Sequence, residues 1–442
     1  MVEPNAAGVD VGAREMYVAI PPDRDAEPVR VFPTFTADLE ALADWLVDRG
    51  ITTVALESTG VYWIPLYQIL EDRGIRPCLV NARHMRNVPG RRTDWHECQW
   101  LQYLHTTGLL RPAFRPQQDV CAVRTLLRHR REMVQMACQH IQHMQKALTQ
   151  MNFQVQHVID DMTGVTGTAI VDAILAGERD PAKLAKLRHG RIRADEATLR
   201  KSLEGDWREE HLFTLRQSRQ MYDAYREQIE ACDKELAKRL GDFEAKVDVA
   251  EKPLPKLTGP SRKRRTKRTG DFRFDTRQEA YRLFGVDVTR IPGLDGMAVS
   301  LFSELGRDLA VKFPTSGEFA SWLALCTDND KTGGSVVWKG VRNVKNRAGQ
   351  MFRQAASSLH RSRSPLGDHL RRMKAKLGPE AGITATAHKI AIIFYTLVTK
   401  QVEYDDSAWA ERDRQRQQRF EQKIKRQARQ LGYQLVPIQQ PE

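Results

Sequence analysis

The sequence has few cysteines and no long apolar run, and each scarcity excludes a class of protein. Its 442 residues include six cysteines without a Cys-x-x-Cys pair, which indicates neither a disulfide scaffold nor a zinc framework. The longest apolar stretch, around Ile390–Val398, is too short to span a bilayer. The first residues lack the basic start and apolar run of a secretory signal. We therefore expect a soluble, cytoplasmic chain of two or three domains with no membrane partner.

Acidic residues are also scarce, but only in one part of the chain. The whole sequence holds 69 Lys+Arg against 56 Asp+Glu, a formal charge of +13. Residues 1–250 hold 33 basic against 36 acidic residues, a balance of −3, whereas residues 251–442 hold 36 against 20, a balance of +16. This asymmetry is typical of a polyanion-binding region attached to another domain. A basic surface that serves solubility alone is the other interpretation.

Residues 1–112 show alternating strand and helix patterns. Helices are predicted at 38–50 and 61–74. The predicted strands lie at 7–12, 16–20, 29–35, 52–59 and 77–82. Such alternation predicts an α/β domain with an open mixed sheet and helices packed against it.

Residues 113–250 have a helical pattern. Apolar residues recur at a 3/4 spacing over 120–155, interrupted only at Arg130, and again over 215–236. An apolar helix with a glycine-bearing entry is expected between them, at 163–181. The two long helices can pair as a coiled-coil arm that supports dimerisation, or they can belong to an ordinary helical bundle within one chain.

The remainder is predicted as a basic linker at 251–277, a compact, mainly helical domain at 278–400 and a basic tail at 401–442. The linker's basic run would bind phosphate without sequence preference, and it includes Arg262, Lys263, Arg264 and Arg265. Residues 289–306 resemble a helix–hairpin–helix. Their Pro-Gly-x-x-Gly turn would either present backbone N–H groups to a DNA phosphate or serve as a tight helix–helix turn.

Basic residues dominate the segment 339–376, which has eleven Lys/Arg and one acid, Asp368. Near-helical spacing predicts that four of the basic residues share one helix face: Arg342, Lys345, Arg347 and Arg353. Such a face would contact phosphates, which confers affinity rather than sequence choice.

Four acidic residues lie where strands and a helix would bring them together. Asp10 lies in the first strand, with a glycine two residues away on each side, and Glu57 ends a later strand. Asp94 and Glu97 begin a predicted helix, and their i, i+3 spacing places them on one face. Clustered carboxylates need a counter-charge, and their hard oxygen ligands suit Mg²⁺. Two such ions, about 3.5–4 Å apart, can assist the attacking and leaving oxygens of phosphoryl transfer.

Each acid also has a purely structural interpretation. Asp10 can be a turn residue, Glu57 a loop residue and Asp94 a helix N-cap. A zinc-like spacing in the first long helix lacks a second ligand cluster and is interpreted as coincidence; it comprises Cys138, His140 and His143. The tryptophans near the acids are expected in the core rather than as platforms for stacked bases; they are Trp63, Trp95 and Trp100.

Many blocks of the chain are similar, in the same order, to one known family. In the N-terminal half they are GVDVG, ALESTGVYW, RTDWHECQWLQ, TGVTGTAIVDAILAGERDP and DWREEHLF. In the C-terminal half they are VDVTRIPGLDGMAVSLFSELGRDLAVKFPTSGEFASWLALC, KNRAGQMFRQAA and SPLGDHLRRMKAKLGPEAGITATAHKIA. Over roughly residues 7–400, the sequence resembles the DEDD transposases of the IS110 insertion-sequence family, recombinases guided by a structured bridge RNA.

The resemblance implies a ribonuclease-H-like domain of the RuvC type that binds Mg²⁺ through Asp10, Glu57, Asp94 and Glu97. The family usually has aspartate at the fourth place, whereas Glu97 keeps the charge and adds one methylene. The resemblance also implies donor and target DNA, a noncoding guide RNA and a homo-oligomer, either dimer or tetramer. Composite sites shared between subunits are expected on the same ground.

The family's second domain supplies a serine that attacks a DNA phosphate and forms a covalent intermediate. Within LCTDNDKTGGSVVWKG, Thr332 stands at the serine position and Ser335 at the family's lysine position. A threonine hydroxyl is a nucleophile, but its β-methyl restricts χ1 and crowds the approach. Attack by Thr332, attack by Ser335 and loss of cleavage all stay open, preferred in that order. Lys331 and Lys339 flank the loop and either assist the phosphate or serve as surface charge.

The predicted function is an insertion-sequence transposase that cuts and rejoins DNA. One alternative is a catalytically decayed or repurposed nucleic-acid-binding relic of such an enzyme. The other is a hydrolytic junction nuclease that uses only the carboxylates.

Overall fold

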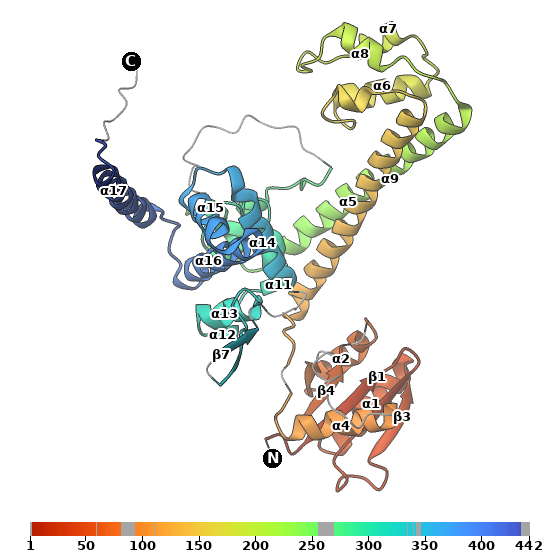
Figure 1. Ribbon diagram of the computed structural model, residues 1–442. Helices are drawn as coiled ribbons and strands as arrows, with labels where there is room; N and C mark the ends of the chain where they lie inside the picture. Colours follow the sequence, from red (N-terminus) through yellow and green to blue (C-terminus); the bar gives the residue numbers. More distant parts are fainter. Residues whose placement is uncertain are drawn as a thin grey trace. The chain divides into compact units, whose positions relative to one another are not determined.

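The computed structural model describes residues 2–58, 60–80, 93–110, 112–254, 269–333, 335–338, 340–341 and 346–434. The chain divides into two compact units, Met1–Arg115 and Pro116–Glu442 (Figure 1). Each unit is described below on its own.

The N-terminal unit is built on a five-stranded mixed sheet of order β3-β2-β1-β4-β5. Its strands are β1 (Ala6–Val11), β2 (Glu15–Ala19), β3 (Val29–Pro33), β4 (Thr53–Glu57) and β5 (Arg76–Val80). Strand β2 is antiparallel to β1 and β3, whereas β1, β4 and β5 run parallel. The helices are α1 (Thr36–Asp48), α2 (Trp63–Asp72) and α4 (Asp94–Thr106). The predicted strands and the mixed sheet are confirmed.

Alternation along the central strands sends their side chains to two different layers. Val9 of β1 and Leu56 of β4 belong to a buried cluster with residues of α1 and α2. Ala55, one position along β4, packs instead with Leu101 of α4. Because successive side chains in a strand point to opposite faces, the next residues on the α4 face are Asp10 and Glu57. The period of the sheet therefore directs both carboxylates toward α4.

The C-terminal unit contains two long helices, α5 (Gln118–Gln150) and α9 (Glu209–Gly241), which pack against each other. They run antiparallel, because Arg130 pairs with Asp233 while His140, farther along α5, stacks on Tyr225, earlier in α9. Shorter helices gather at one end of the pair (Figure 1): α6 (Val165–Leu175), α7 (Pro181–Ala185) and α8 (Glu196–Ser202).

The first long helix is shorter than its apolar pattern predicts. Helix α5 ends at Gln150, and Asn152 has a positive φ of 60°. Val155 lies in the separate 3-10 turn η1 (Val155–His157), although it is fully buried. The apolar spacing continued past residue 150 because Val155 packs into the same core as the helix, not because the helix continues.

Arg130, the only interruption of the apolar stripe, is buried between the two helices. Its guanidinium pairs with Asp233, and its Nη1 and Nη2 donate to the carbonyl oxygens of Gly270 and Asp271 at 3.2 and 3.1 Å. The same guanidinium lies 3.9 Å from the ring centroid of Phe272. A charge at this position is tolerated because nearly every donor has an acceptor.

The rest of this unit is mainly helical, as predicted. Its elements are α10 (Thr276–Phe284), η2 (Val288–Arg290), α11 (Ala298–Leu305), α12 (Leu309–Lys312), α13 (Ser316–Trp322), β6 (Asp330–Thr332), β7 (Ser335–Trp338), α14 (Arg347–Ser358), η3 (Leu359–Arg361), α15 (Pro365–Leu377), α16 (Pro379–Lys400) and α17 (Ser407–Gln430). Helix α16 contacts α13, α14 and α15. Its Phe394 packs against Phe284, Phe319 and Phe352.

Helix α16 is longer than the apolar stretch expected from the sequence. Within the described residues it alone has the length and apolar composition to cross a membrane, with 22 residues and a mean hydropathy of 1.4. Ile390, Ala391 and Phe394 are fully buried in the protein core. Together with its contacts to three neighbouring helices, this burial is what a core helix shows.

Candidate active site

Three carboxylates from three elements meet on the α4 side of the sheet. Asp10 of β1, Glu57 of β4 and Glu97 of α4 each offer one oxygen, and these oxygens lie within 4.8 Å of one another. All three side chains are partly buried. The structure thus brings together three of the four acids that were predicted to converge.

Gly8 allows α4 to lie directly on β1. A Cβ atom at this position would lie 2.3 Å from the backbone nitrogen of Gln102 and 2.4 Å from the carbonyl oxygen of Cys98. Gly8 is two residues before Asp10, so both positions face α4. The missing side chain therefore brings the helix close enough for Glu97 to approach Asp10. The sequence pattern included Gly8 but did not predict that it allows α4 to lie on β1.

The clustered charges act most strongly on Asp10. Burial first, and then the negative charges of Glu97, Glu57 and Asp94 in that order, raise the pKa of this carboxyl to about 7. A hydrogen bond from the backbone N–H of Val11 partly opposes the shift. Without a cation, the protein therefore holds a proton on Asp10 near neutral pH.

Asp94 lies outside this three-carboxylate cluster. It is exposed in the first turn of α4, and its charge reaches Asp10 without joining the 4.8 Å group. The suggestion that Asp94 caps the helix is wrong, because Thr93 is the N-cap and its hydroxyl accepts from the N–H of His96. Only one of the two acids at the start of α4 is thus placed with the strand carboxylates.

The donor set fits a hard divalent cation. Carboxylate oxygens are the ligands that Mg²⁺ prefers, and a cation removes the repulsion that raises the pKa of Asp10. Among the described residues, no other group of three or more His, Cys, Asp or Glu side chains is close enough to hold a metal.

Aromatic side chains near the cluster divide between core and surface. Trp63 packs in the sheet core and Trp100 stacks on Tyr103 at 5.5 Å. Trp95 is 43% exposed, so the expectation that it is a core residue is wrong. Tyr17, which the sequence did not single out, is the cross-strand partner of Asp10, and the nearby carboxylates, Glu15 first, raise its pKa.

The proposed nucleophiles occupy the tip of a β-hairpin. Thr332 ends β6 and Ser335 begins β7, and these two exposed residues are directly paired across the strands. Gly333 has a positive φ of 58°, as a tight two-residue hairpin turn requires. Paired residues face the same side of a hairpin. Ser335 therefore neighbours Thr332 across the hairpin, and the choice between them as nucleophile stays a prediction.

The predicted basic residues are only partly described. Seven of the residues proposed to flank or bind nucleic acid lie outside the described residues: Arg262, Lys263, Arg264, Arg265, Lys339, Arg342 and Lys345. Helix α14 begins at Arg347 and is capped by Asn346, and of the four residues predicted on one helix face it carries Arg347 and Arg353. Arg353 is half-buried, where it donates to the carbonyl oxygen of Ala324 at 2.6 Å and burial lowers its pKa.

The helix–hairpin–helix-like segment has one glycine used for packing. A Cβ at Gly293, where φ is 94°, would lie 2.6 Å from the carbonyl oxygen of Ala355 in α14. A Cβ at Gly296, by contrast, would meet no atom within 4 Å. The first glycine therefore supports the tight-turn interpretation, and the second faces open space.

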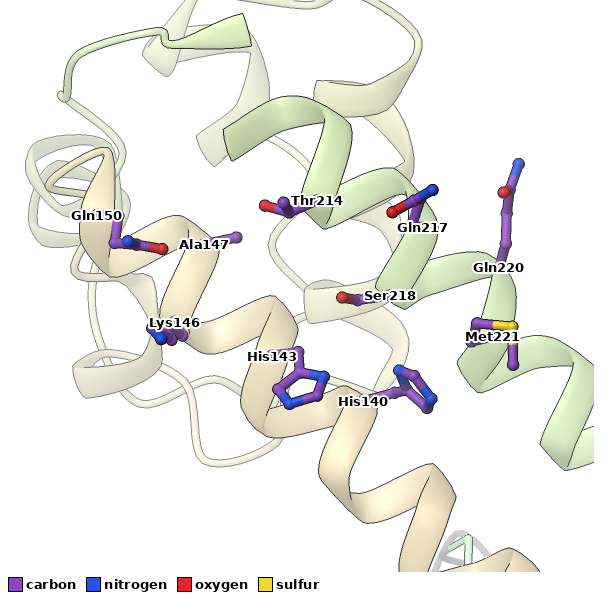
Figure 2. Close-up of a pocket in the computed structure, with 10 residues that line it drawn as sticks. All are labelled: His140, His143, Lys146, Ala147, Gln150, Thr214, Gln217, Ser218, Gln220 and Met221. Atoms are coloured by element: carbon purple, nitrogen blue, oxygen red, sulfur yellow. The ribbon is translucent and has the colours of Figure 1, made fainter. Parts of the chain in front are cut away.

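The zinc-like residues of α5 do not form a ligand cluster within the described chain. Cys138 is exposed, whereas His140 and His143 line a pocket of about 560 Å³ between α5 and α9, opposite Ser218 and Met221 (Figure 2). The two imidazole rings meet edge to face at 5.5 Å. Burial, and then the charge of His143, lower the pKa of His140. The interpretation of the spacing as coincidence is consistent with this arrangement.

The segment that carries the acidic cluster is similar to a known protein family. Residues 7–153 match the family model of the IS110 DEDD transposases, described as a transposase. The matched segment contains Asp10, Glu57, Asp94 and Glu97, and it ends before the hairpin of Thr332 and Ser335. No individual curated protein matches the chain. Over residues 7–153, the chain is therefore similar to the IS110 family of DEDD transposases.

Proposed function

We propose that this protein is an insertion-sequence recombinase that binds Mg²⁺ through Asp10, Glu57 and Glu97 and cuts and rejoins DNA. The observation that carries the proposal is the meeting of these three carboxylates within 4.8 Å. Asp94 contributes long-range negative charge from the exposed start of α4. When bound, the cation would polarise a phosphate oxygen and offset the charge that develops there.

The chain's own side chains would prepare this site. Asp10 must lose its proton before it can act as a ligand, and its pKa of about 7 places that loss near neutral pH. Glu57 and Glu97 approach from different elements, which fixes the site against both the sheet and α4. Glu97 is one methylene longer than the family's aspartate, and the close contact at Gly8 sets where its carboxylate lies.

We further propose that a hydroxyl at the hairpin tip attacks the scissile phosphodiester. The Thr332 oxygen bonds to phosphorus, the bond to one deoxyribose oxygen breaks, and that oxygen takes up the hydroxyl proton. The product is a covalent protein–DNA adduct and a free hydroxyl on the other strand end. Ser335 is the alternative nucleophile, since it faces the same side of the hairpin without a β-methyl group.

The remaining features of the proposal rest on the family resemblance. They are guidance by a bridge RNA, a dimeric or tetrameric assembly with composite sites, and a cytoplasmic location. The pairing of α5 and α9 supports a coiled-coil arm between the metal-binding and C-terminal domains. The domain limits at 112, 250, 277 and 400 belong to the same proposal.

The test uses purified full-length protein with its flanking RNA and with donor and target DNA. We expect protease-resistant protein–DNA adducts that require a divalent cation and disappear in Asp10→Asn. Thr332→Ala should abolish them, whereas Ser335→Ala should leave them. The opposite result for the last two variants identifies Ser335 as the nucleophile.

Two outcomes would favour the alternatives. Nicked DNA without any adduct would indicate a hydrolytic junction nuclease that uses only the carboxylates. Binding of RNA or DNA without cleavage by the wild-type protein would indicate a relic retained for binding.

A further inference from the structure

A second pocket, of about 380 Å³, lies in the C-terminal unit beside α5, α11 and α14. Arg128 and Arg131 of α5 line it, together with Arg347 at the first position of α14. Gly296, just before α11, and Ser300, within α11, also line this pocket. We call this site the arginine pocket.

The charges of the arginine pocket do not cancel. Among the described residues, its only lining carboxylate is that of Glu304, and this group already pairs with Arg128 at 3.0 Å and with Arg124 at 3.4 Å. Arg131 and Arg347 form no ion pair within the described residues. The pocket therefore holds positive charge that calls for an anion.

The state of Arg347 supports this view. Burial lowers its pKa, and the positive charges of Arg128 and Arg131 lower it further, while Glu304 and Glu132 only partly oppose them. Arginine stays protonated in proteins, so the cluster cannot relieve this repulsion by losing a proton. A bound anion would relieve it.

We propose that the arginine pocket holds a phosphodiester group of a nucleic-acid strand, with Arg131 and Arg347 as its charged contacts. The identity of the ligand rests on the proposed function, whereas binding itself requires no catalysis. Guanidinium groups match the planar geometry of phosphate oxygens. Since α5 supplies Arg131 and α14 supplies Arg347, the bound strand would bridge the base of the long helix pair and the C-terminal helices.

The test measures binding of the full-length protein to a fluorescent single-stranded DNA and to an RNA of the same sequence. Divalent metal is omitted so that cleavage does not intervene, and salt is varied. Arg131→Ala and Arg347→Ala should each weaken binding about tenfold. Each should also lower the slope of log affinity against log salt by about 0.7 for single strands. Arg239→Ala is the control. It removes a positive charge from α9, outside the arginine pocket, and should change the affinity and its salt dependence little.

Gly296 provides a matched pair of variants. Its Cβ would meet no atom within 4 Å, so both substitutions fit sterically. Gly296→Asp adds a carboxylate to the pocket and should weaken binding strongly, whereas Gly296→Asn has nearly the same shape without charge and should weaken binding clearly less. Thermal unfolding checks that each variant is folded.

Each outcome has a defined meaning. An effect confined to the DNA or to the RNA probe identifies the strand that occupies the pocket. Equal weakening by Gly296→Asp and Gly296→Asn, or arginine variants that behave like Arg239→Ala, would overturn the proposal. If adducts never form while these binding effects appear, the proposed function fails and the arginine pocket stands.

Discussion

Asp10 is the residue in which structure and chemistry are most tightly linked. Its position in β1 is fixed by the alternation of the strand, and its neighbours Glu57 and Glu97 arrive from other elements. The same packing that gathers the three oxygens also withdraws Asp10 from water and raises its pKa to about 7. Without a cation, burial and the repulsion between the carboxylates therefore disfavour the charged form of Asp10.

The raised pKa of Asp10 makes the stability of the metal-free protein depend on pH. The folded-state pKa of Asp10, about 7, lies above its ordinary value of 3.8, so the folded state binds the proton more tightly. The resulting stabilisation is complete below the ordinary value and is lost as pH rises through about 7. Asp10→Asn should thus unfold at a higher temperature than wild type at alkaline pH, with the difference shrinking toward acidic pH. Calorimetry in chelator measures this, and a pH-independent difference would contradict the assignment.

Gly8 should tolerate no side chain. Gly8→Ala places a methyl group 2.3 Å from backbone in α4, and overpacking of this kind costs about 1–3 kcal/mol. We expect a lower unfolding temperature and weaker Mg²⁺ binding, because α4 must move and carries Glu97 with it. Calorimetric titration and thermal unfolding test both. Gly190→Ala, where a Cβ meets nothing within 4 Å, is the control.

Among the elements, the pair of long helices shows how a local sequence anomaly can stabilise a contact. The stripe of apolar residues is interrupted at Arg130, and that interruption holds the pair together with the segment at 270–272 through Asp233, two backbone carbonyls and the Phe272 ring. The hairpin of β6 and β7 is a simpler element, in which Thr332 and Ser335 are paired across the strands.

Removal of one partner of the buried pair should be strongly destabilising. Arg130→Ala leaves Asp233 buried without its counter-charge, which costs about 3–5 kcal/mol. Replacement of both residues, Arg130→Met with Asp233→Leu, should cost less than Arg130→Ala alone. Denaturant unfolding measures each loss. Arg239→Ala, which breaks an exposed pair with Glu235, should have little effect, and an equal loss in both single variants would refute the argument.

For the molecule as a whole, the division of charge separates two tasks. The acidic cluster lies in the nearly neutral N-terminal part, where three carboxylate oxygens lie within 4.8 Å of one another. The balance of +16 lies beyond residue 250, together with Arg347 of the arginine pocket and the hairpin. In the proposed function, the metal site lies in the first part alone, whereas strand binding draws mainly on the basic part, with Arg131 contributed by the first.

Nucleic-acid affinity should therefore depend steeply on salt. If about six phosphates are contacted, affinity should fall roughly 1,000-fold between about 50 and about 200 mM salt. Fluorescence anisotropy with the full-length protein measures this dependence. Asp10→Asn should retain it, since the acidic cluster is not the source of the positive charge, and a shallow dependence would contradict the division of tasks.

Much of the fold could be predicted from local patterns. Strand alternation and helical spacing identified all five strands of the sheet and the two long helices, because each element's period follows from its own backbone geometry. They failed at the end of α5, since a buried residue in a turn satisfies the same apolar spacing as one in a helix. They also failed at Trp95, whose burial depends on what packs over the start of α4.

The sequence by itself determined which residues are candidates for the chemistry, because carboxylates, hydroxyls and the blocks that resemble the family are visible as residue types in order. Only the tertiary structure decided which of them meet. Asp10, Glu57 and Glu97 converge while Asp94 stays apart, since a strand period and a glycine contact set distances that sequence spacing does not encode. In the same way, Arg131 and Arg347 are 216 positions apart and share a pocket only because α5 and α14 fold together. Charge repulsion and phosphate binding act through space, and the chain's order does not fix that space.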